Sequence, residues 1–110
     1  METKMRTHIL GQTRMGLPII AHEFGDNGPE ILIIGGVHGN EIEGVAAARF
    51  ILARLIAETY EYQLRITIIP ELNPEGVLMK TRSNSAGVDL NRNLPTKDWT
   101  PEFTEPKYNP

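Results

Sequence analysis

The stretch ILIIGGVHGNEIEG, residues 31–44, joins an apolar run directly to a dense group of polar residues. Its apolar part, residues 31–37, is typical of a strand that is covered on both faces of a parallel sheet. Residues 41–58 then carry apolar side chains at roughly helical spacing, with Asn40 as the expected N-cap. A buried strand followed at once by such a helix predicts the first two parts of a βαβ unit.

The segments on either side extend the predicted sheet. Residues 64–69 form the next apolar run, so we expect them to pair in parallel with residues 31–37. Two earlier runs, residues 7–10 and 17–24, flank the glycine-bounded segment GQTRMG and predict a hairpin. The sequence therefore predicts an α/β fold with a mixed, largely parallel sheet and flanking helices.

The second part of the chain is much less regular. Residues 71–95 are rich in glycine, proline, asparagine and aspartate, and long loops in compact domains are often functional. Residues 96–110 read as an irregular tail or loop. Only one helix is visible, whereas a parallel sheet needs cover on both faces. We therefore expect residues 1–110 to be the N-terminal portion of a single domain whose remainder follows residue 110.

Composition excludes several classes of function. The chain has 110 residues, a net charge of −3 and no basic block, which argues against a nucleic-acid partner. It has no cysteine, so a metal site would have to use histidine and carboxylate ligands. No apolar run approaches a membrane span and no secretory h-region is visible, so we expect a cytoplasmic protein with no membrane partner.

His38 and Glu41 are the first candidate site residues. They lie three residues apart, just past the carboxyl end of the predicted strand, where ligands bind in open α/β sheets. Together they provide half or more of a zinc site of the His/Glu type. The alternative is an ordinary turn in which Glu41 only serves the helix dipole. His8 and His22 have no carboxylate at ligand spacing and are expected to be structural.

A second polar cluster lies in the irregular region. Asn91 and Arg92 together could grip a carboxylate, because arginine presents a bidentate fork and asparagine adds a donor. Arg82 could polarise a carbonyl group. Asp89 could accept a hydrogen bond from the free ring nitrogen of His38. Taken alone, these residues could equally serve turn geometry or be solvated.

Read together, the motifs resemble a known family. HGNE at 38–41, NPEG at 73–76, TRSN at 81–84 and GVDLNRN at 87–93 are similar in order and spacing to the zinc carboxypeptidases of the carboxypeptidase A type. Within that family the sequence most resembles the bacterial murein peptide amidases. The aspartoacylase and succinylglutamate desuccinylase branch shares the HGNE opening and the DLNR segment.

The resemblance implies a metal centre with one zinc ion. His38 and Glu41 would be ligands of that ion, and Asp89 would orient His38 from the far side of the ring. A zinc-activated water would attack the scissile carbonyl group.

The resemblance also implies how a substrate is held. Arg82 would hold the scissile carbonyl oxygen, and Asn91 and Arg92 would grip a terminal carboxylate. The implied partner is a small peptide with a free carboxylate, and for the murein peptide amidases the bond cut joins γ-D-glutamate to meso-diaminopimelate.

The family also needs a third zinc ligand, a later histidine, and a glutamate base, and neither is present in its family context here. We therefore expect residues 1–110 alone to bind zinc weakly and to be inactive. Two other hypotheses remain open: a deacylase of N-acyl amino acids, and a non-catalytic peptide-binding module that kept the carboxylate clamp.

Overall fold

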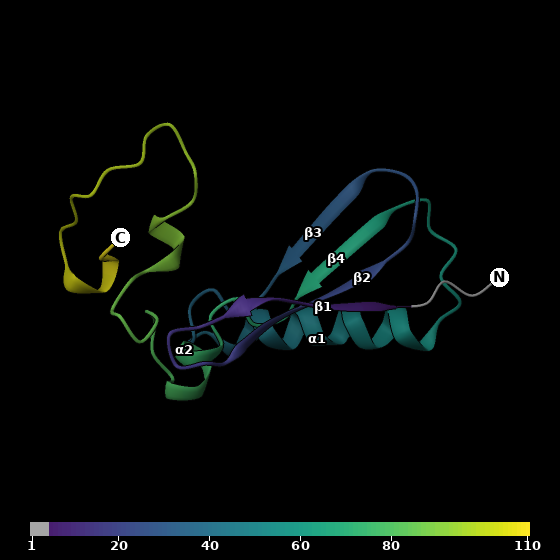
Figure 1. Cartoon of the computed structure of the whole chain (residues 1–110), viewed down its shortest axis with the longest axis horizontal. Coiled ribbons are helices and arrows are strands. Elements are labelled where there is room, and N and C mark those ends of the chain that lie inside the picture. Colours follow the sequence, from purple (N-terminus) through teal and green to yellow (C-terminus); the bar gives the residue numbers. More distant parts are fainter. Residues whose placement is uncertain (1–4) are drawn as a thin grey trace.

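A four-stranded mixed sheet forms the centre of the computed structural model, which describes residues 5–110. Residues 1–4, which belong to the predicted domain 1–110, lie outside the described part. The strands are β1 (Arg6–Gln12), β2 (Pro18–Phe24), β3 (Glu30–Ile34) and β4 (Arg65–Ile69). The helices are α1 (Ile42–Ala57) and α2 (Pro74–Met79), with 3-10 turns η1 (Leu90–Arg92) and η2 (Pro106–Tyr108). Figure 1 shows this order along the chain.

The sheet order is β1-β2-β4-β3. β3 and β4 are parallel and are joined through α1, as the predicted βαβ unit requires. The hairpin of β1 and β2 is also present, and β2 pairs with β4 in antiparallel fashion. The predicted mixed α/β sheet is therefore confirmed, with the parallel character confined to β3 and β4 among the described strands.

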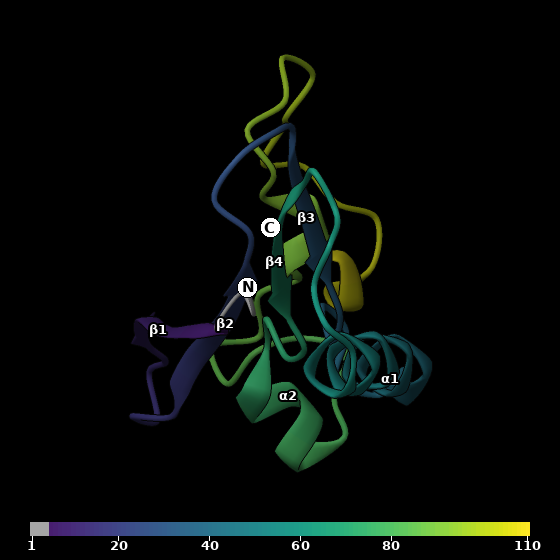
Figure 2. The same ribbon diagram turned by 90° about the vertical axis from the view of Figure 1, so that its right-hand side faces the viewer.

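The core lies between α1 and one face of the sheet. Ala48, Leu52 and Leu55 of α1 are buried against Phe24 of β2 and Ile68 of β4. Burial of these side chains supplies the main driving force for docking the helix, at roughly 1.5–3 kcal/mol for each large side chain. Figure 2, which looks along α1, shows the helix lying against one side of the sheet.

The start of α1 differs from the prediction. The helix begins at Ile42, and its N-cap is Glu41, whose side chain makes no capping hydrogen bond. The predicted N-cap, Asn40, lies one residue too early. The Glu41 carboxylate instead hydrogen-bonds the His38 ring, so the first turn gives up a capping contact in favour of the site.

The prediction that the apolar strand is covered on both faces was wrong for the described residues. β3 is an edge strand, and α1 covers only one face of the sheet. On the opposite face, Leu32 is 59% exposed and Ile34 is 41% exposed. No helix in the described part of the chain is long and apolar enough to cross a membrane.

The predicted irregular region contains a short helix that the sequence analysis missed. α2 begins at Pro74, a favoured first position because proline has no N–H to leave unpaired. Asn73 caps it by accepting a hydrogen bond from the Gly76 N–H at 3.0 Å. Lys80 then ends the helix in the left-handed conformation, at φ 58°. Beyond η1 the tail has no regular structure before η2 and extends away from the sheet (Figure 1).

Candidate active site

The carboxyl ends of β3 and β4 point toward α2 (Figure 1). The loop that follows β3 carries the candidate residues His38 and Glu41. The segments that leave these two strands stay joined by backbone hydrogen bonds. The Leu72 N–H donates to the Gly35 carbonyl at 3.0 Å, and the Asn73 N–H donates to the Gly36 carbonyl at 2.9 Å. The loop that carries His38 therefore rests on the segment that leads into α2.

The ring of His38 lies between two carboxylates. Its Nδ1 is 2.8 Å from Oε2 of Glu41, and its Nε2 is 2.8 Å from Oδ1 of Asp89. A neutral imidazole carries one N–H, so it donates to only one of the two carboxylates. When that hydrogen bond goes to Asp89, Nδ1 turns a lone pair toward Glu41. The ring nitrogen and the Glu41 carboxylate are then two possible ligands for a metal cation.

Asp89 is the buried anchor of this group, with an exposed fraction of 0%. Besides His38, it accepts hydrogen bonds from Nε of Arg82 at 3.0 Å and from the Asn91 N–H at 3.0 Å. Burial acts to raise the pKa of Asp89, but the hydrogen bonds from His38, Asn91 and Arg82 outweigh it and lower the pKa. The carboxylate is therefore held in its charged form beside the ring.

Arg82 extends the group toward Glu41. Its Nη1 lies 4.0 Å from Oε2 of Glu41, while its Nε is bonded to Asp89. The guanidinium also lies over the ring of Tyr108, with Cζ 5.1 Å from the ring centroid. The structure thus brings together four predicted residues: His38, Glu41, Arg82 and Asp89.

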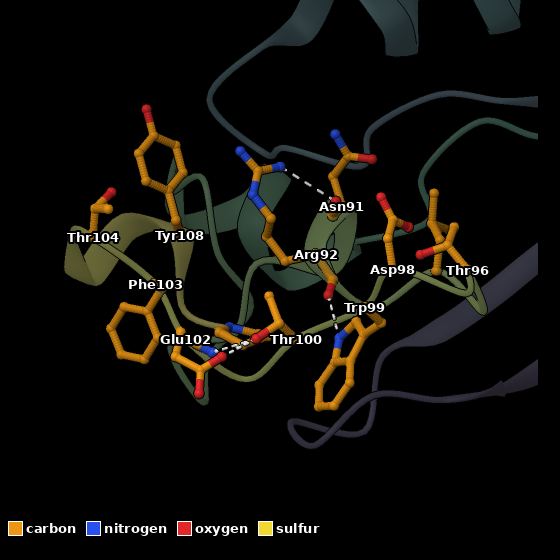
Figure 3. A pocket seen from close by; sticks show the side chains of 12 residues that line it. Asn91, Arg92, Thr96, Asp98, Trp99, Thr100, Glu102, Phe103, Thr104 and Tyr108 are labelled. Carbon is orange, nitrogen blue, oxygen red and sulfur yellow. Dashed lines mark hydrogen bonds between the residues drawn. The ribbon is translucent and has the colours of Figure 1, made fainter.

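Asn91 and Arg92 lie beside this group. Asn91 is bonded to Asp89 through its backbone N–H, and neither side chain hydrogen-bonds the group among the described residues. Both side chains point the same way from η1, and the Arg92 guanidinium donates to the Asn91 carbonyl at 3.3 Å (Figure 3). The Arg92 guanidinium also lies over the Tyr108 ring, with Cζ 4.8 Å from the ring centroid. Next to them is a cavity of about 530 Å³, walled in part by Trp99 and Phe103.

Tyr108 contacts Arg82 and Arg92, and sequence reasoning missed it. It joins the two arginines through cation–π contacts, although it lies in the tail, which has no periodicity to place it. The tail is held there because the Asp89 N–H donates to the Asn109 carbonyl at 2.6 Å. No signal in the sequence could have revealed this long-range contact.

His8 and His22 lie on the hairpin, away from the candidate site. Nε2 of His8 is 3.4 Å from Oε2 of Glu23, and Nδ1 of His22 is 3.3 Å from Oγ1 of Thr7. Burial, and then the charge of Arg49, lowers the pKa of His22. Both histidines therefore fit the structural role expected from the sequence.

The donor set suits zinc in type but is small. A hollow of about 220 Å³ is lined by His38, Glu41 and Glu43. Within residues 5–110, no group of three or more histidine, cysteine or acidic side chains is placed to hold a metal ion. His38 and Glu41 therefore offer one nitrogen and one carboxylate, where zinc centres usually use three or four protein ligands.

Asn73 and Glu75 are further polar residues that sequence reasoning did not place, and both are 2% exposed. Nδ2 of Asn73 lies 3.4 Å from the Val37 carbonyl and 3.5 Å from the Arg82 carbonyl. Asn73 therefore contacts both the loop that carries His38 and the segment that carries Arg82. The signal available was the motif NPEG itself, since Asn-Pro followed by an acid favours the start of a helix.

Comparison with known proteins identifies the family of this chain. The zinc carboxypeptidase family model matches residues 2–110. Murein peptide amidase A of Escherichia coli K12 is 30% identical over an alignment of 110 residues, covering 94% of this chain and 41% of the relative. Murein peptide amidase A of Vibrio campbellii is 37% identical over 73 residues, covering 66% and 28%. The chain therefore belongs to the zinc carboxypeptidase family, and it spans well under half the length of these relatives.

Solved structures give the same fold. Murein-tripeptide amidase from Escherichia coli O157 matches with a TM-score of 0.65 and 27% identity, covering 89% of this chain and 40% of that one. A succinylglutamate desuccinylase/aspartoacylase from Rhodobacter sphaeroides matches with a TM-score of 0.63 and 28% identity, covering 87% and 31%. The carboxypeptidase-like fold expected from the motifs is therefore confirmed.

Proposed function

We propose that this protein is a zinc-dependent hydrolase that cleaves a peptide or amide bond next to a free terminal carboxylate. One observation carries the proposal: the His38 ring lies 2.8 Å from both Glu41 and Asp89, and Arg82 is bonded to the same Asp89. With zinc bound, the hydrogen bond to Asp89 would keep the ring proton on Nε2 and leave the Nδ1 lone pair for the metal, as a metal-binding histidine needs.

The residues of the chain divide the work of such a reaction. His38 and Glu41 would hold zinc, which polarises a carbonyl group and supplies a bound water of lowered pKa. Asp89 would accept the hydrogen bond from Nε2 of His38 and so orient the ring. Arg82, whose Nη groups remain available beside Glu41, would hold the carbonyl oxygen of the substrate.

Asn91 and Arg92 supply the proposed carboxylate clamp. Their side chains point the same way and line the cavity of about 530 Å³ (Figure 3). An arginine fork beside an amide donor gives bidentate recognition of a carboxylate. The clamp selects substrates in which the bond to be cut lies close to a free carboxylate.

A cell-wall peptide is the substrate that we propose first. The similarity to murein peptide amidases supports this choice. The bond would be that between γ-D-glutamate and meso-diaminopimelate. The reaction would then serve cell-wall recycling in the cytoplasm. An N-acyl amino acid is the second candidate, supported by the likeness to a succinylglutamate desuccinylase/aspartoacylase.

A panel of two substrates tests the proposal. The protein as its gene encodes it is purified, loaded with zinc, and incubated with a murein tripeptide or with N-succinylglutamate. We expect release of diaminopimelate from the tripeptide, no change in N-succinylglutamate, and loss of the reaction after chelation. Cleavage of N-succinylglutamate alone would establish the deacylase instead. Binding of the tripeptide without cleavage of either compound would make the protein a peptide-binding module and overturn the proposal.

Residues 1–110 alone serve as the comparison in that assay. With two protein donors for the metal in the described residues, we expect weak zinc binding and no hydrolysis. Stoichiometric zinc together with hydrolysis by residues 1–110 would contradict this expectation.

A further inference from the structure

Glu75 is a buried acid that the proposed reaction does not use. It is 2% exposed, and acidic side chains are rarely buried unless they are paired. Here both carboxylate oxygens accept hydrogen bonds from the backbone. Oε2 accepts from the Met15 N–H of the β1–β2 turn at 3.2 Å, and Oε1 accepts from the Ser85 N–H at 2.8 Å. Glu75 therefore ties together two loops that are far apart in the sequence.

The carboxylate of Glu75 is held in its charged form. Hydrogen bonding by Ser85, through its hydroxyl and then its backbone N–H, lowers the pKa of Glu75 to about 2. The backbone bond is the one with regular geometry, since Ser85 Oγ has no hydrogen-bond partner among the described residues. A charged acceptor makes stronger hydrogen bonds than a neutral one, so the tie to Ser85 is a firm one.

The loop that Glu75 holds carries half of the candidate site. Ser85 lies between Arg82 and Asp89, inside a turn that is closed by its own hydrogen bonds. The Asn84 N–H donates to the Val88 carbonyl, and Oδ1 of Asn84 accepts from the Val88 N–H, each at 3.0 Å. Because this turn is braced internally, fixing Ser85 also restricts Arg82 on one side and Asp89 on the other.

The other half of the site rests on the same helix. A methyl group built on Gly39 would overlap the backbone carbonyl of Gly76, so the loop from His38 to Glu41 lies directly against the first turn of α2. Gly76 is the residue next to Glu75. α2 is thus the common support of both halves, and Glu75 is its connection to the half that carries Arg82 and Asp89.

We propose that Glu75 is a positioning residue that sets the distance of Asp89 and Arg82 from His38 by holding Ser85. The proposal rests on the proposed function, in which Asp89 and Arg82 serve the zinc-binding and carbonyl-binding groups. Glu75 itself does not touch the metal or the substrate. Its effect would reach the site through the braced turn of residues 84–88.

The test replaces Glu75 with glutamine, which keeps the size of the side chain and removes the charge. In the metal-free protein, we expect amide hydrogen exchange at Ser85 and Asp89 to rise roughly tenfold, since one charge-assisted bond is lost at each anchored loop. Exchange in β2 and β4 should rise less than exchange at Ser85 and Asp89, because it reports only the loss of global stability. Zinc affinity, measured by titration calorimetry, should fall severalfold in the same variant.

Two further variants separate positioning from loss of stability. Leu55→Ala destabilises the core beneath α1 without touching either loop. It should leave zinc affinity unchanged. Exchange at Asp89 should rise no more than exchange in the core strands does. Glu75→Asp keeps the charge and should recover part of the zinc affinity that Glu75→Gln loses. It also supplies the measurement if the glutamine variant does not fold.

Three outcomes would overturn the proposal. These are wild-type exchange at Ser85 and Asp89 in Glu75→Gln, equal losses of zinc affinity in Glu75→Asp and Glu75→Gln, or the same loss in Leu55→Ala. Failure of the proposed function looks different: His38→Ala would then leave zinc binding unchanged, while the effect of Glu75→Gln on exchange at Asp89 would remain.

Discussion

At the scale of single residues, the two contacts of His38, with Glu41 and with Asp89, give the most direct test of the proposed zinc site. We expect His38→Ala to abolish zinc binding, because His38 is the one histidine among the described residues that line the hollow. Asp89→Asn should lower zinc affinity by about 10–100-fold, since it loosens the orientation of the ring rather than removing it. His22→Ala, which changes a histidine on the hairpin, is the matched control and should bind zinc as the wild type does. Retained zinc binding in His38→Ala would contradict the ligand assignment.

Arg92 gives a prediction about substrate choice. Arg92→Ala should weaken a substrate with a free terminal carboxylate by about 1.5–3 kcal/mol, the usual value of hydrogen bonds to a charged group. The same peptide with an amidated terminus should be little affected. The ratio of kcat/KM for the two peptides measures this, and Arg54→Ala, a change on the exposed side of α1, provides the control. An equal effect on both peptides would argue against the carboxylate clamp.

Glu75 makes the stability of the fold depend on pH. Its pKa is about 2 in the folded protein, against an ordinary value of 4.5. The unfolded chain therefore takes up the proton at a higher pH than the folded chain, and acid favours unfolding. The stabilisation is fully present above about pH 4.5 and is lost as the pH falls toward 2. Thermal unfolding should show a steeper fall over this window for the wild type than for Glu75→Gln, and equal slopes would refute the assignment.

At the scale of elements, the contact between the His38 loop and α2 depends on the absence of a side chain. Gly39→Ala would push a methyl group into the Gly76 carbonyl, a backbone atom that cannot move aside. We expect a loss of at least about 1–3 kcal/mol in the free energy of unfolding. Gly44→Ala is the control, because a methyl group there meets only the backbone of Gly35 and Gly36, at ordinary van der Waals distances. This change should stabilise α1 by about 1 kcal/mol. Equal denaturation midpoints would show that the His38 loop does not pack on α2 as described.

The elements also show what sequence reasoning can and cannot reach. Periodicity and apolar runs were enough for the hairpin, for β3, β4 and α1, and the joint spacing of the motifs was enough to group His38 with Asp89. α2 was missed because its six residues are too short to show a period. The cap of α1 was misplaced because Glu41 bonds His38 rather than the helix. The position of a helix cap and the formation of a short helix depend on hydrogen-bond partners that come close only in the folded chain.

At the scale of the whole molecule, the sheet has one covered face and one open face. Leu32 and Ile34 are exposed on the open face, and β3 presents a free edge among the described strands. Apolar side chains on an edge strand favour association with other chains. We therefore expect residues 1–110 to self-associate as concentration rises.

A single substitution tests this expectation. Leu32→Lys should shift the sedimentation profile toward the monomer, with the free energy of unfolding unchanged within about 0.5 kcal/mol, because the side chain is already exposed. Ala53→Lys makes the same change of charge at an exposed site of α1, which lies on the covered face of the sheet, and should not alter association. Association that persists in Leu32→Lys would place the contact on another surface.

The two contacts of the His38 ring also differ in how far they reach along the chain. Glu41 is three residues away, whereas Asp89 is 51 residues away. The first contact can form as soon as the turn before α1 forms, but the second must wait for a long segment to fold back. Closing such a loop lowers the entropy of the chain, and this cost is offset only when the contacts between distant segments have formed. We therefore expect the metal-binding pair to exist before the ring is oriented, so that the site matures at the end of folding rather than at its beginning.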